Sequence, residues 1–346
     1  MAIIQGPVSR IQQEQFVRKL QEVGPDLPGC STHAREYLQH LIRHAPYYTQ
    51  IAAFHLNLLG SQLAIPWSTV RLVDFGAGNG LMGLLAVYSG AGSVVVQDIN
   101  PEFTHAAQVL ARQLSLYPEA FITGDERQLQ EWCSQQNWNP HGLVSFDVIE
   151  HVYDLDQLFH CFRELNPQLQ LIMGTGVNAH HPLKRRAFMK MQQTDEWNGG
   201  SSVDRSLYGP SSSAFRDIRR NILQQHWPEI TPAQLEEWVS RTRGMHRGDI
   251  IRAITRYQEN KLLPEPPDHP TNTCDPVTGS WTERLLTLQE YRTILQRHQY
   301  RMEVTDGFYN DGEGGIRSVF LKLLNAALPF FRHRLSPFLV FQIRPV

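Results

Sequence analysis

The sequence predicts an α/β protein whose core is a doubly wound, mostly parallel sheet of seven strands. Two observations lead to this fold class. Between residues 69 and 178, short apolar runs rich in valine and isoleucine alternate with patterns of helical period. After a region of helical patterns only, residues 179–285, strand patterns return between residue 286 and the C-terminus. Strands that alternate with helices along a chain pair in parallel, with helices on both faces of the sheet.

Composition excludes several classes of protein. The 346 residues include 32 Lys and Arg against 34 Asp and Glu, a formal net charge of −2. Such a balance gives no overall field that would draw the chain to nucleic acid or to an anionic membrane. The four cysteines form no CxxC pair, which argues against zinc ribbons and disulfide frameworks and predicts reduced thiols in the cytoplasm. The N-terminus has no signal-peptide pattern, and no run of about eighteen apolar residues predicts a membrane span.

The N-terminal part, residues 1–68, is predicted to be a helical lid. Residues 8–60 show helical patterns and no strand. Leu38, Leu41 and Ile42 recur at helical spacing, and a second apolar series follows Pro46. Because proline interrupts a helix, Pro46 is expected to separate two helices.

The first part of the sheet, residues 69–178, should contain five strands. The second intervening helix should begin at Asn100, a suitable N-cap that is followed by Pro101 at the first helical position. The expected strands are 69–75, 93–98, 120–125, 142–150 and 168–176, and the helices after the first two are 81–90 and 100–114.

The remaining parts are a helical insertion, residues 179–285, and the end of the sheet, residues 286–346. In the insertion we expect helices at 213–227, 231–243 and 247–263, with loops at 198–213 and 264–276. In the last part we expect a helix, a strand, a long helix and a strand, at residues 287–300, 301–309, 314–335 and 338–345.

A glycine loop, "VDFGAGNGLMG", joins the first strand to the next helix. Glycine lets the backbone approach a ligand closely, and the helix N-terminus offers free N–H groups. Two motifs compete for these glycines. Gly78, Gly80 and Gly83 fit the dinucleotide pattern G-x-G-x-x-G, with the acid Asp98 about twenty residues on. Gly76, Gly78 and Gly80 fit G-x-G-x-G, which begins directly after the strand.

The second motif resembles motif I of the class I S-adenosylmethionine-dependent methyltransferases. Asp74 stands two residues before Gly76, and the late order helix, strand, long helix, strand resembles the end of the methyltransferase sheet, whose last strand inserts antiparallel. The resemblance covers residues 70–178 and 286–346, so that 69–178 would be a Rossmann-like cofactor-binding half. It implies a cofactor site for S-adenosyl-L-methionine that is made from Asp74, Gly76, Gly78, Gly80, Asp98, Ile99 and Asp125.

The resemblance also implies a role for most of these residues. The three glycines would pack against the methionine part of the cofactor. Asp98, at the end of the second strand, would accept hydrogen bonds from both ribose hydroxyls. Asp125, in "TGDE" after the third strand, would face the adenine amine. A helix N-cap is the alternative role for Asp125.

Three titratable residues stand at the end of the predicted fourth strand in "DVIEH", namely Asp147, Glu150 and His151. Ligands bind beyond the carboxyl ends of parallel strands, so these residues are candidates for catalysis. The stretch resembles the "ExxEH" of the ubiquinone-type O-methyltransferases and of the small-RNA 3′-end methyltransferases, where it holds a divalent metal. Here the first acid is shorter, and Ser280 of "TGSW" stands where the ubiquinone type has a further histidine.

Three roles therefore remain open for this stretch. The three residues could ligate a divalent metal, because two carboxylates and an imidazole suit a hard or borderline ion. His151 could be a general base without a metal, which the incomplete ligand set favours. The stretch could also serve packing alone. His180 and His181, after the fifth strand, are rival bases.

The insertion is expected to select the methyl acceptor. Its clustered arginines predict solvated helix faces first and a pocket for a carboxylate, phosphate or sugar acid second. Aromatic residues are present, for example Trp197, Tyr208 and Trp238, but acids interrupt any basic stripe, so a nucleic-acid partner is not favoured. The sequence thus predicts a methyltransferase that acts on a small molecule, on oxygen slightly more than on nitrogen. The alternatives are an RNA or nucleotide methyltransferase, a non-catalytic scaffold of this fold, and an NAD-dependent oxidoreductase.

Overall fold

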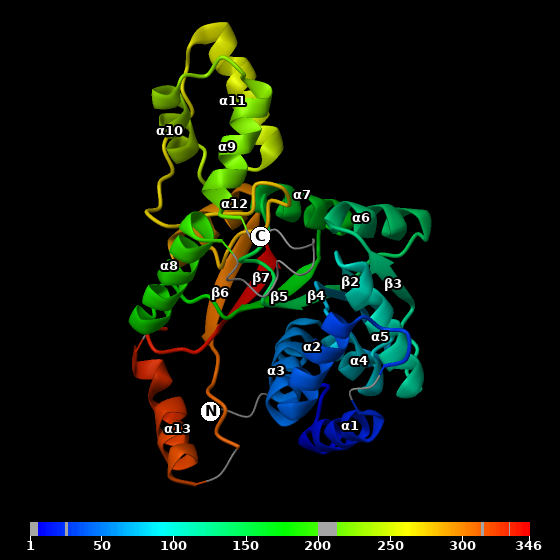
Figure 1. Cartoon of the computed structure of the whole chain (residues 1–346). Helices are drawn as coiled ribbons and strands as arrows, with labels where there is room; N and C mark the ends of the chain where they lie inside the picture. The colour runs from blue at the N-terminus through cyan, green and yellow to red at the C-terminus, as the bar shows by residue number, and fades with distance from the viewer. Residues whose placement is uncertain (1–5, 25–26, 200–212, 313–314, 332) are drawn as a thin grey trace. The chain divides into compact units, whose positions relative to one another are not determined.

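The computed structural model describes residues 6–24, 27–199, 213–312, 315–331 and 333–346 (Figure 1). The chain divides into two compact units, and each is described by itself. Unit 1 comprises Met1–Ile149, Leu155–Gly176 and Leu288–Val346. Unit 2 comprises Glu150–Asp154 and Val177–Thr287. The N-terminal helices and both parts of the sheet therefore belong to one unit.

The core of unit 1 is a seven-stranded sheet, which confirms the predicted α/β class. The strand order is β3-β2-β1-β4-β5-β7-β6. The first five strands are parallel, whereas β7 runs antiparallel to both of its neighbours, β5 and β6. The strands are β1 (Arg71–Phe75), β2 (Ser93–Asp98), β3 (Ala120–Thr123), β4 (Gly142–Phe146), β5 (Gln170–Thr175), β6 (Tyr300–Asp306) and β7 (Leu339–Pro345).

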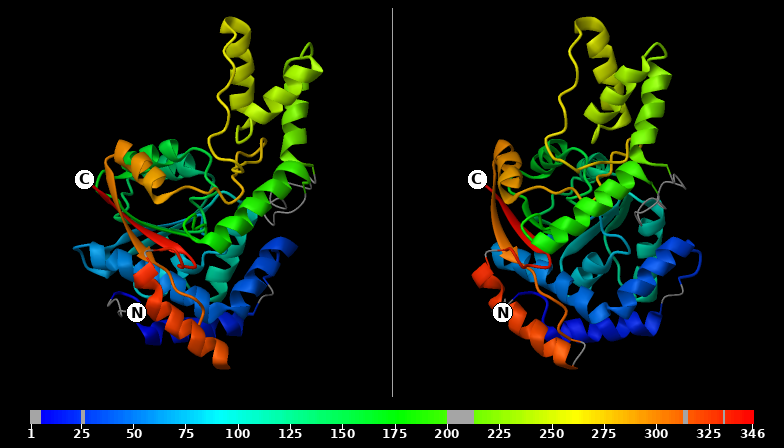
Figure 2. Two further views of the ribbon diagram at one scale, coloured as in Figure 1. Left: turned by 90° about the vertical axis from the view of Figure 1, so that its left-hand side faces the viewer. Right: turned by 60° about the vertical axis from the view of Figure 1, so that its left-hand side comes forward.

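Helices cover both faces of this sheet (Figures 1 and 2). The helices on one face share a hydrophobic core with the strands; they are α1 (Arg10–Val23), α2 (Thr32–Arg43), α3 (Ala45–Gln62), α4 (Leu81–Tyr88) and α5 (Pro101–Gln113). On the other face lie α6 (Glu126–Gln135), α7 (Leu155–Leu165) and α12 (Leu288–Arg297). The remaining elements of unit 1 are α13 (Gly315–Ala327) between β6 and β7 and the short 3₁₀ turns η1 (Trp67–Thr69) and η3 (Leu328–Phe331).

Local sequence signals explain several helix boundaries. Asn100 caps α5 by accepting a hydrogen bond from the Glu102 N–H at 2.9 Å, as predicted, and Pro101 takes the first helical position. Pro46 stands in the first turn of α3, so that it separates α2 from α3 as expected. The middle of α3 is buried almost all round, from Ile51 to Leu59, so α3 is a core helix and does not act as a cover.

The fourth strand ends earlier than predicted. The apolar pattern predicts a strand from residue 142 to residue 150, but β4 stops at Phe146 and its register with β5 stops at the pair Phe146–Gly174. Asp147 has φ of 54°, a left-handed conformation that cannot continue a strand. The apolar run through Ile149 misled the prediction because Ile149 is buried in a turn and not in the sheet.

Unit 2 consists of four helices and an extended return segment, residues 261–287. These are α8 (Pro182–Trp197), α9 (Phe215–His226), α10 (Pro232–Arg241) and α11 (Arg247–Asn260). The helices α9 to α11 confirm the three predicted ones and enclose a core around Trp238. The predictions do not include α8, because the buried positions of that helix are polar (Gln192, Asp195 and Glu196) and so show no apolar period. Most of the predicted loop 198–213, with Tyr208, lies outside the described residues.

Buried polar contacts hold unit 2 together. The Arg219 guanidinium of α9 pairs with the Glu196 carboxylate of α8, and both side chains are buried. Thr273, from the return segment, donates to the same carboxylate at 2.8 Å. Because a buried charge is costly unless it is paired and hydrogen-bonded, these contacts tie the segment to the helices.

All four cysteines are free thiols and are buried, in agreement with the predicted reduced state. Among the helices in the described ranges, none is long and apolar enough to cross a membrane.

Candidate active site

The strand order reverses next to β1, because β1 pairs with β2 on one side and with β4 on the other. In open α/β sheets, the crevice beyond the carboxyl ends at such a point is where ligands bind. The loop after β1 and the turn after β4 touch there. A side chain at Gly76 would collide with Val148, which follows β4. The glycine loop and the start of the "DVIEH" stretch are therefore neighbours at one edge of the sheet.

The glycine loop has the left-handed backbone that its sequence requires. The φ angles of Gly76, Gly78 and Gly80 are 66°, 54° and 79°, values that other residues adopt only with strain. Gly80 is the N-cap of α4 and, being glycine, supplies no side-chain cap of its own. The loop thus places side-chain-free backbone and the start of a helix at the carboxyl edge of the sheet, where a ligand can approach closely.

Asp98 is fixed against this loop at the end of β2. Its carboxylate accepts hydrogen bonds from the Gly78 N–H at 2.7 Å and from the Asn100 N–H at 2.8 Å, and it is 7 % exposed. An ionised carboxylate can accept more bonds than these two. The preceding residue, Gln97, bonds to the Gly76 N–H at 3.0 Å and to the Gly124 carbonyl. Gln97 therefore joins the loops after β1 and β3, a role that the sequence analysis does not predict.

Asp74, in β1, lies beneath the glycine loop and stabilises the start of α4. Its carboxylate accepts a hydrogen bond from the Gly83 N–H at 2.6 Å, in the first turn of α4. A side chain at Gly83 would meet this carboxylate at 3.0 Å, so the glycine leaves the room that Asp74 needs. Burial raises the pKa of Asp74 to about 7, the Gly83 hydrogen bond opposes this shift, and the nearby Asp98 adds to it.

We expect the raised pKa of Asp74 to be visible in the pH dependence of stability. A carboxyl with a folded pKa near 7, compared with an ordinary 3.8, holds a proton in the folded state that the unfolded state has released. The wild type should therefore lose stability relative to Asp74→Asn as the pH rises from about 4 to 7, by at least about 1 kcal/mol. Urea unfolding of both proteins at pH 5 and pH 8 measures this difference. An equal pH dependence in the two proteins would contradict it.

Asp125 and Ile99 occupy the other predicted cofactor positions. Asp125 is the N-cap of α6, with its carboxylate accepting from the Arg127 N–H at 2.8 Å in a capping box. This is the alternative role that the sequence suggested, and contact with an adenine stays a prediction. Ile99 directly follows Asp98 and is 54 % exposed, so its side chain is available to cover a planar ligand.

The helix α2 lies beside the glycine loop, which the sequence alone does not reveal. A side chain at Gly78 would meet the Tyr37 ring at 3.2 Å. The Asn79 amide donates to the Ala34 carbonyl at 3.1 Å, and its buried amide oxygen has no hydrogen-bond partner among the described residues. Tyr37 also contacts the ring of Phe103, with the centroids 5.0 Å apart. Tyr37 and Ala34 are about forty positions from the loop in sequence, so no local pattern indicates the contact.

Asp147 is exposed at the end of β4. Its N–H donates to the Gly174 carbonyl at 3.0 Å, and its carboxylate accepts from the Gly176 N–H at 2.6 Å. Tyr47 and Tyr48, at the start of α3, are close enough to feel its charge, although the Tyr47 hydroxyl donates to the Phe308 carbonyl at 3.0 Å and the Tyr48 hydroxyl bonds to His40 Nε2 at 2.9 Å. Burial raises the pKa of both phenols, and the Asp147 charge raises them further. The two tyrosines therefore remain neutral hydrogen-bond donors or acceptors near the predicted catalytic acid.

Glu150 and His151 belong to unit 2, where the return segment holds them. The His151 ring nitrogen Nδ1 lies 2.9 Å from the Trp281 carbonyl, and the Trp281 N–H donates back to the His151 carbonyl at 3.1 Å. A carbonyl only accepts, so Nδ1 carries the proton and Nε2 is the basic nitrogen of the neutral ring. Ser280 directly precedes Trp281. The "TGSW" segment thus lies against His151, but with serine in place of a further metal ligand.

The rival histidines differ in their environments. His181 is the N-cap of α8, and its Nδ1 accepts from the Lys184 N–H at 3.4 Å. Burial and the Lys184 charge lower the pKa of His181. His180 is exposed. Among the residues that the structure describes, no three His, Cys, Asp or Glu side chains are grouped so as to hold a metal ion.

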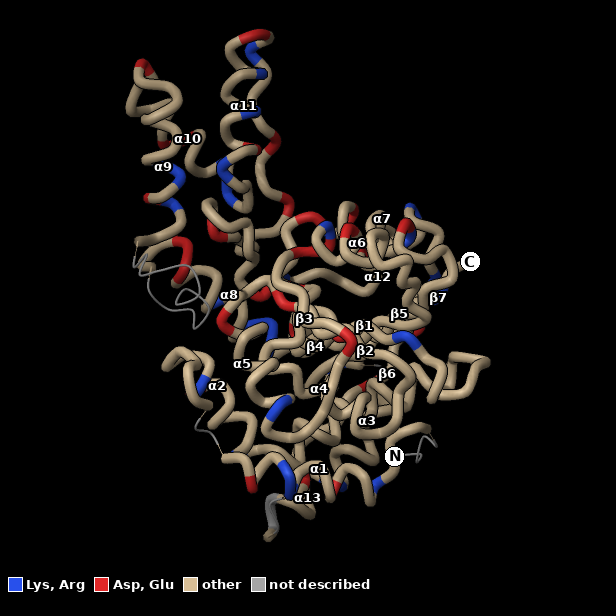
Figure 3. Tube along the Cα trace, turned by 90° about the vertical axis from the view of Figure 1, so that its right-hand side faces the viewer, with Lys and Arg blue, Asp and Glu red and all other residues tan. Residues whose placement is uncertain are grey.

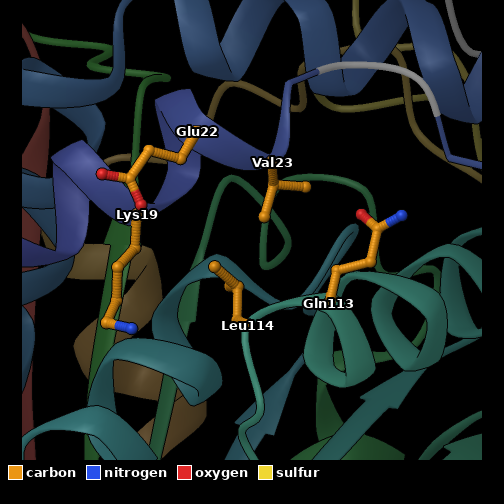
Figure 4. A pocket seen from close by; sticks show the side chains of 5 residues that line it. All are labelled: Lys19, Glu22, Val23, Gln113 and Leu114. Atoms are coloured by element: carbon orange, nitrogen blue, oxygen red, sulfur yellow. The ribbon is translucent and has the colours of Figure 1, made fainter.

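A hollow of about 370 Å³ is found elsewhere in unit 1 (Figure 4). It lies between the C-terminal end of α1 and the end of α5 and is lined by Lys19, Glu22, Val23, Gln113 and Leu114. Because α5 begins at the carboxyl edge of the sheet, its last residues lie at the opposite edge. The hollow is therefore separate from the glycine loop, and its mixed lining indicates no particular ligand.

Comparisons with known proteins do not assign a function to this chain. No protein-family model and no curated protein matches the sequence. Among solved structures, an S-adenosylmethionine-dependent methyltransferase from Mesorhizobium loti is 15 % identical, with 83 % of this chain and 95 % of that chain covered and a TM-score of 0.39. A Listeria monocytogenes protein provisionally named as such an enzyme is 10 % identical, with 85 % and 99 % covered and a TM-score of 0.40. A Thermus protein without an assigned function is 18 % identical, with 38 % and 72 % covered and a TM-score of 0.29. Likeness at this level assigns no activity.

Proposed function

We propose that this protein is an S-adenosylmethionine-dependent methyltransferase that acts on a small molecule, with transfer to oxygen slightly favoured over transfer to nitrogen. The observation that carries the proposal is the Asp98 carboxylate, held 2.7 Å from the Gly78 N–H at the carboxyl edge of the sheet. It stands beside three left-handed glycines and at the point where the strand order reverses. The antiparallel β7 between β5 and β6 supports a methyltransferase over a dinucleotide enzyme, whose sheet has the order 3-2-1-4-5-6.

The residues at this edge fit S-adenosylmethionine. The glycine loop and the start of α4 would take its methionine part, and Asp98 would accept from its ribose hydroxyls. Tyr37 beside Gly78 and the exposed Ile99 would cover its flat surfaces. When bound, this cofactor supplies an activated methyl group on a positively charged sulfur, which an acceptor displaces in line.

The protein then has two tasks, to position the acceptor and to remove its proton. His151 is the proposed base, since the Trp281 carbonyl fixes its tautomer with Nε2 as the basic nitrogen. Glu150 is proposed to tune this histidine, and Asp147 with Tyr47 and Tyr48 to orient a hydroxyl of the acceptor. In the alternative mechanism, Asp147, Glu150 and His151 would hold a divalent metal. The short side chain of Asp147 and the serine at position 280 argue against this alternative.

The insertion gives little support for an anionic acceptor. Several arginines of the insertion already have acidic partners. Arg216 and Arg220 pair with Glu236, Arg241 pairs with Glu237, and Arg252 pairs with Asp249. Figure 3 shows basic and acidic positions interspersed along α9, α10 and α11. This pattern agrees with solvated helix faces and gives an RNA substrate no broad basic face.

The proposed activity can be tested directly. The purified protein should bind S-adenosylmethionine in calorimetry and transfer a labelled methyl group to a member of a panel of small hydroxylated and amine compounds. A protein that binds the cofactor but methylates RNA in preference to every small molecule would favour the nucleotide alternative. Absence of cofactor binding would favour a scaffold, and tight binding of NADH instead would favour an oxidoreductase.

A further inference from the structure

The helix α13 and the turn η3, between β6 and β7, expose an apolar stripe. In unit 1 both lie at the periphery (Figures 1 and 2). Large apolar side chains of this segment are exposed to solvent, namely Val319 (59 %), Phe320 (62 %), Leu323 (67 %), Phe330 (85 %) and Phe331 (43 %). In α13 the spacing of Val319, Phe320 and Leu323 places them on one side of the helix, and the two phenylalanines of η3 follow directly. Single exposed apolar residues are ordinary, whereas a contiguous group marks an interaction surface.

The opposite side of α13 is the one that attaches to the protein. Ser318 donates to the Asp311 carbonyl, and the Asn325 amide bonds to both the N–H and the carbonyl of Tyr309, at 2.7 and 3.0 Å. Leu328, three residues on, is 3 % exposed. The helix is thus anchored through polar groups and turns its aromatic and aliphatic side chains outward, the reverse of an ordinary surface helix. Such an arrangement leaves the apolar side available to a partner.

Charge indicates which partner fits this stripe. From Gly315 to Val346 the sequence has no Asp or Glu, and its basic residues are Arg317, Lys322, Arg332, Arg334 and Arg344. Lys322 and Arg334 are exposed beside the stripe. Of the neighbouring acids, Asp306 pairs with His333 at 2.9 Å, and Glu303 faces Arg344 at 3.9 Å; Asp311 precedes the helix. The segment therefore combines an apolar face with a local excess of positive charge.

We propose that α13 and η3 dock this protein on the surface of an anionic lipid bilayer. An apolar face rimmed by Lys and Arg is the pattern of helices that lie in a membrane interface, where acyl chains take the apolar side chains and acidic headgroups attract the cations. A second copy of the chain fits less well, because pairing the same stripe would bring the same cations together. The expectation of no membrane partner rests on the net charge of −2. That value is a sum over the whole chain, so it does not reveal the local positive charge of this segment. The proposal does not depend on the proposed enzyme activity.

Vesicle binding by the full-length protein tests the proposal. In flotation, the wild type should partition onto vesicles of equal parts phosphatidylglycerol and phosphatidylcholine and much less onto phosphatidylcholine alone. Phe320→Ser/Leu323→Ser should lower partitioning by about ten-fold or more, because the apolar contact is lost. The control Ile11→Ser/Tyr117→Ser removes two equally exposed apolar side chains, 68 % and 79 % exposed, elsewhere in unit 1 and should partition like the wild type. Circular dichroism checks that each variant is folded.

A second variant tests the contribution of positive charge to vesicle binding. Lys322→Glu/Arg334→Glu, or high salt with the wild type, should also weaken binding to the anionic vesicles. The proposal is overturned if the wild type does not bind these vesicles, if it binds both vesicle types equally, or if the serine variant binds like the wild type. A dimer that dissociates in the serine variant, without vesicle binding by the wild type, would show instead that a second copy covers the stripe.

Discussion

Replacing Asp98 by alanine is expected to weaken the binding of S-adenosylmethionine by about 1.5–3 kcal/mol, the usual cost of losing hydrogen bonds to a charged group. The carboxylate is held in place by the N–H groups of Gly78 and Asn100, so it would bind a ribose without reorganising. Titration calorimetry of the wild type and the variant measures the difference. Asp98→Asn, which retains one acceptor oxygen but no charge, should fall between the two.

The alanine variant has a second effect that a control must separate. It leaves the N–H groups of Gly78 and Asn100 without the carboxylate, which should also lower stability. Thermal unfolding without cofactor reports that loss, and Glu119→Ala, an exposed acid at the far edge of the sheet before β3, is the matched control for affinity. Unchanged affinity in a folded Asp98→Ala protein would refute the cofactor assignment.

Replacing His151 by alanine is expected to lower the rate of methyl transfer by about 10²–10⁴-fold, the range for a lost general base. Part of the activity should return at high pH, where the acceptor ionises without help. Glu150→Ala should be milder, because Glu150 would act only through the orientation and pKa of His151. Initial rates at saturating cofactor over a range of pH values measure these effects on the acceptor that the screen identifies.

The alternative mechanism, with a divalent metal at the same site, predicts different results. If Asp147, Glu150 and His151 hold a divalent ion, a chelator should abolish turnover, added Mg²⁺ or Mn²⁺ should restore it, and Glu150→Ala should be as severe as His151→Ala. With His151 as a metal-free base, the chelator should have no effect. His160→Ala, an exposed histidine of α7, controls for the substitution itself. Wild-type turnover by His151→Ala would exclude both roles and leave packing as the function of the stretch.

Patterns that depend on neighbouring residues predicted the fold well. The change from helical to strand period at residue 69, and its return after residue 286, indicated a mostly parallel seven-stranded sheet, and the structure has one. The glycine loop needed left-handed backbone at Gly76, Gly78 and Gly80, and each has it. These features are predictable because period and φ preference are properties of a few adjacent residues. The predicted end of β4 was wrong because Val148 and Ile149 are apolar residues that pack in a turn and do not continue the strand.

The sequence by itself therefore determined the sheet, the helix starts at Asn100 and Pro46, and the chemistry available at the carboxyl edge. Only the tertiary structure decided which residues far apart in the chain come into contact within each unit. It brings Tyr37 of α2 against Gly78, sets Tyr47 and Tyr48 near Asp147, and fastens His151 to the backbone of Trp281. It also turns the apolar side of α13 outward. Contacts between residues far apart in the chain depend on how whole elements pack, and no local period or spacing records that packing.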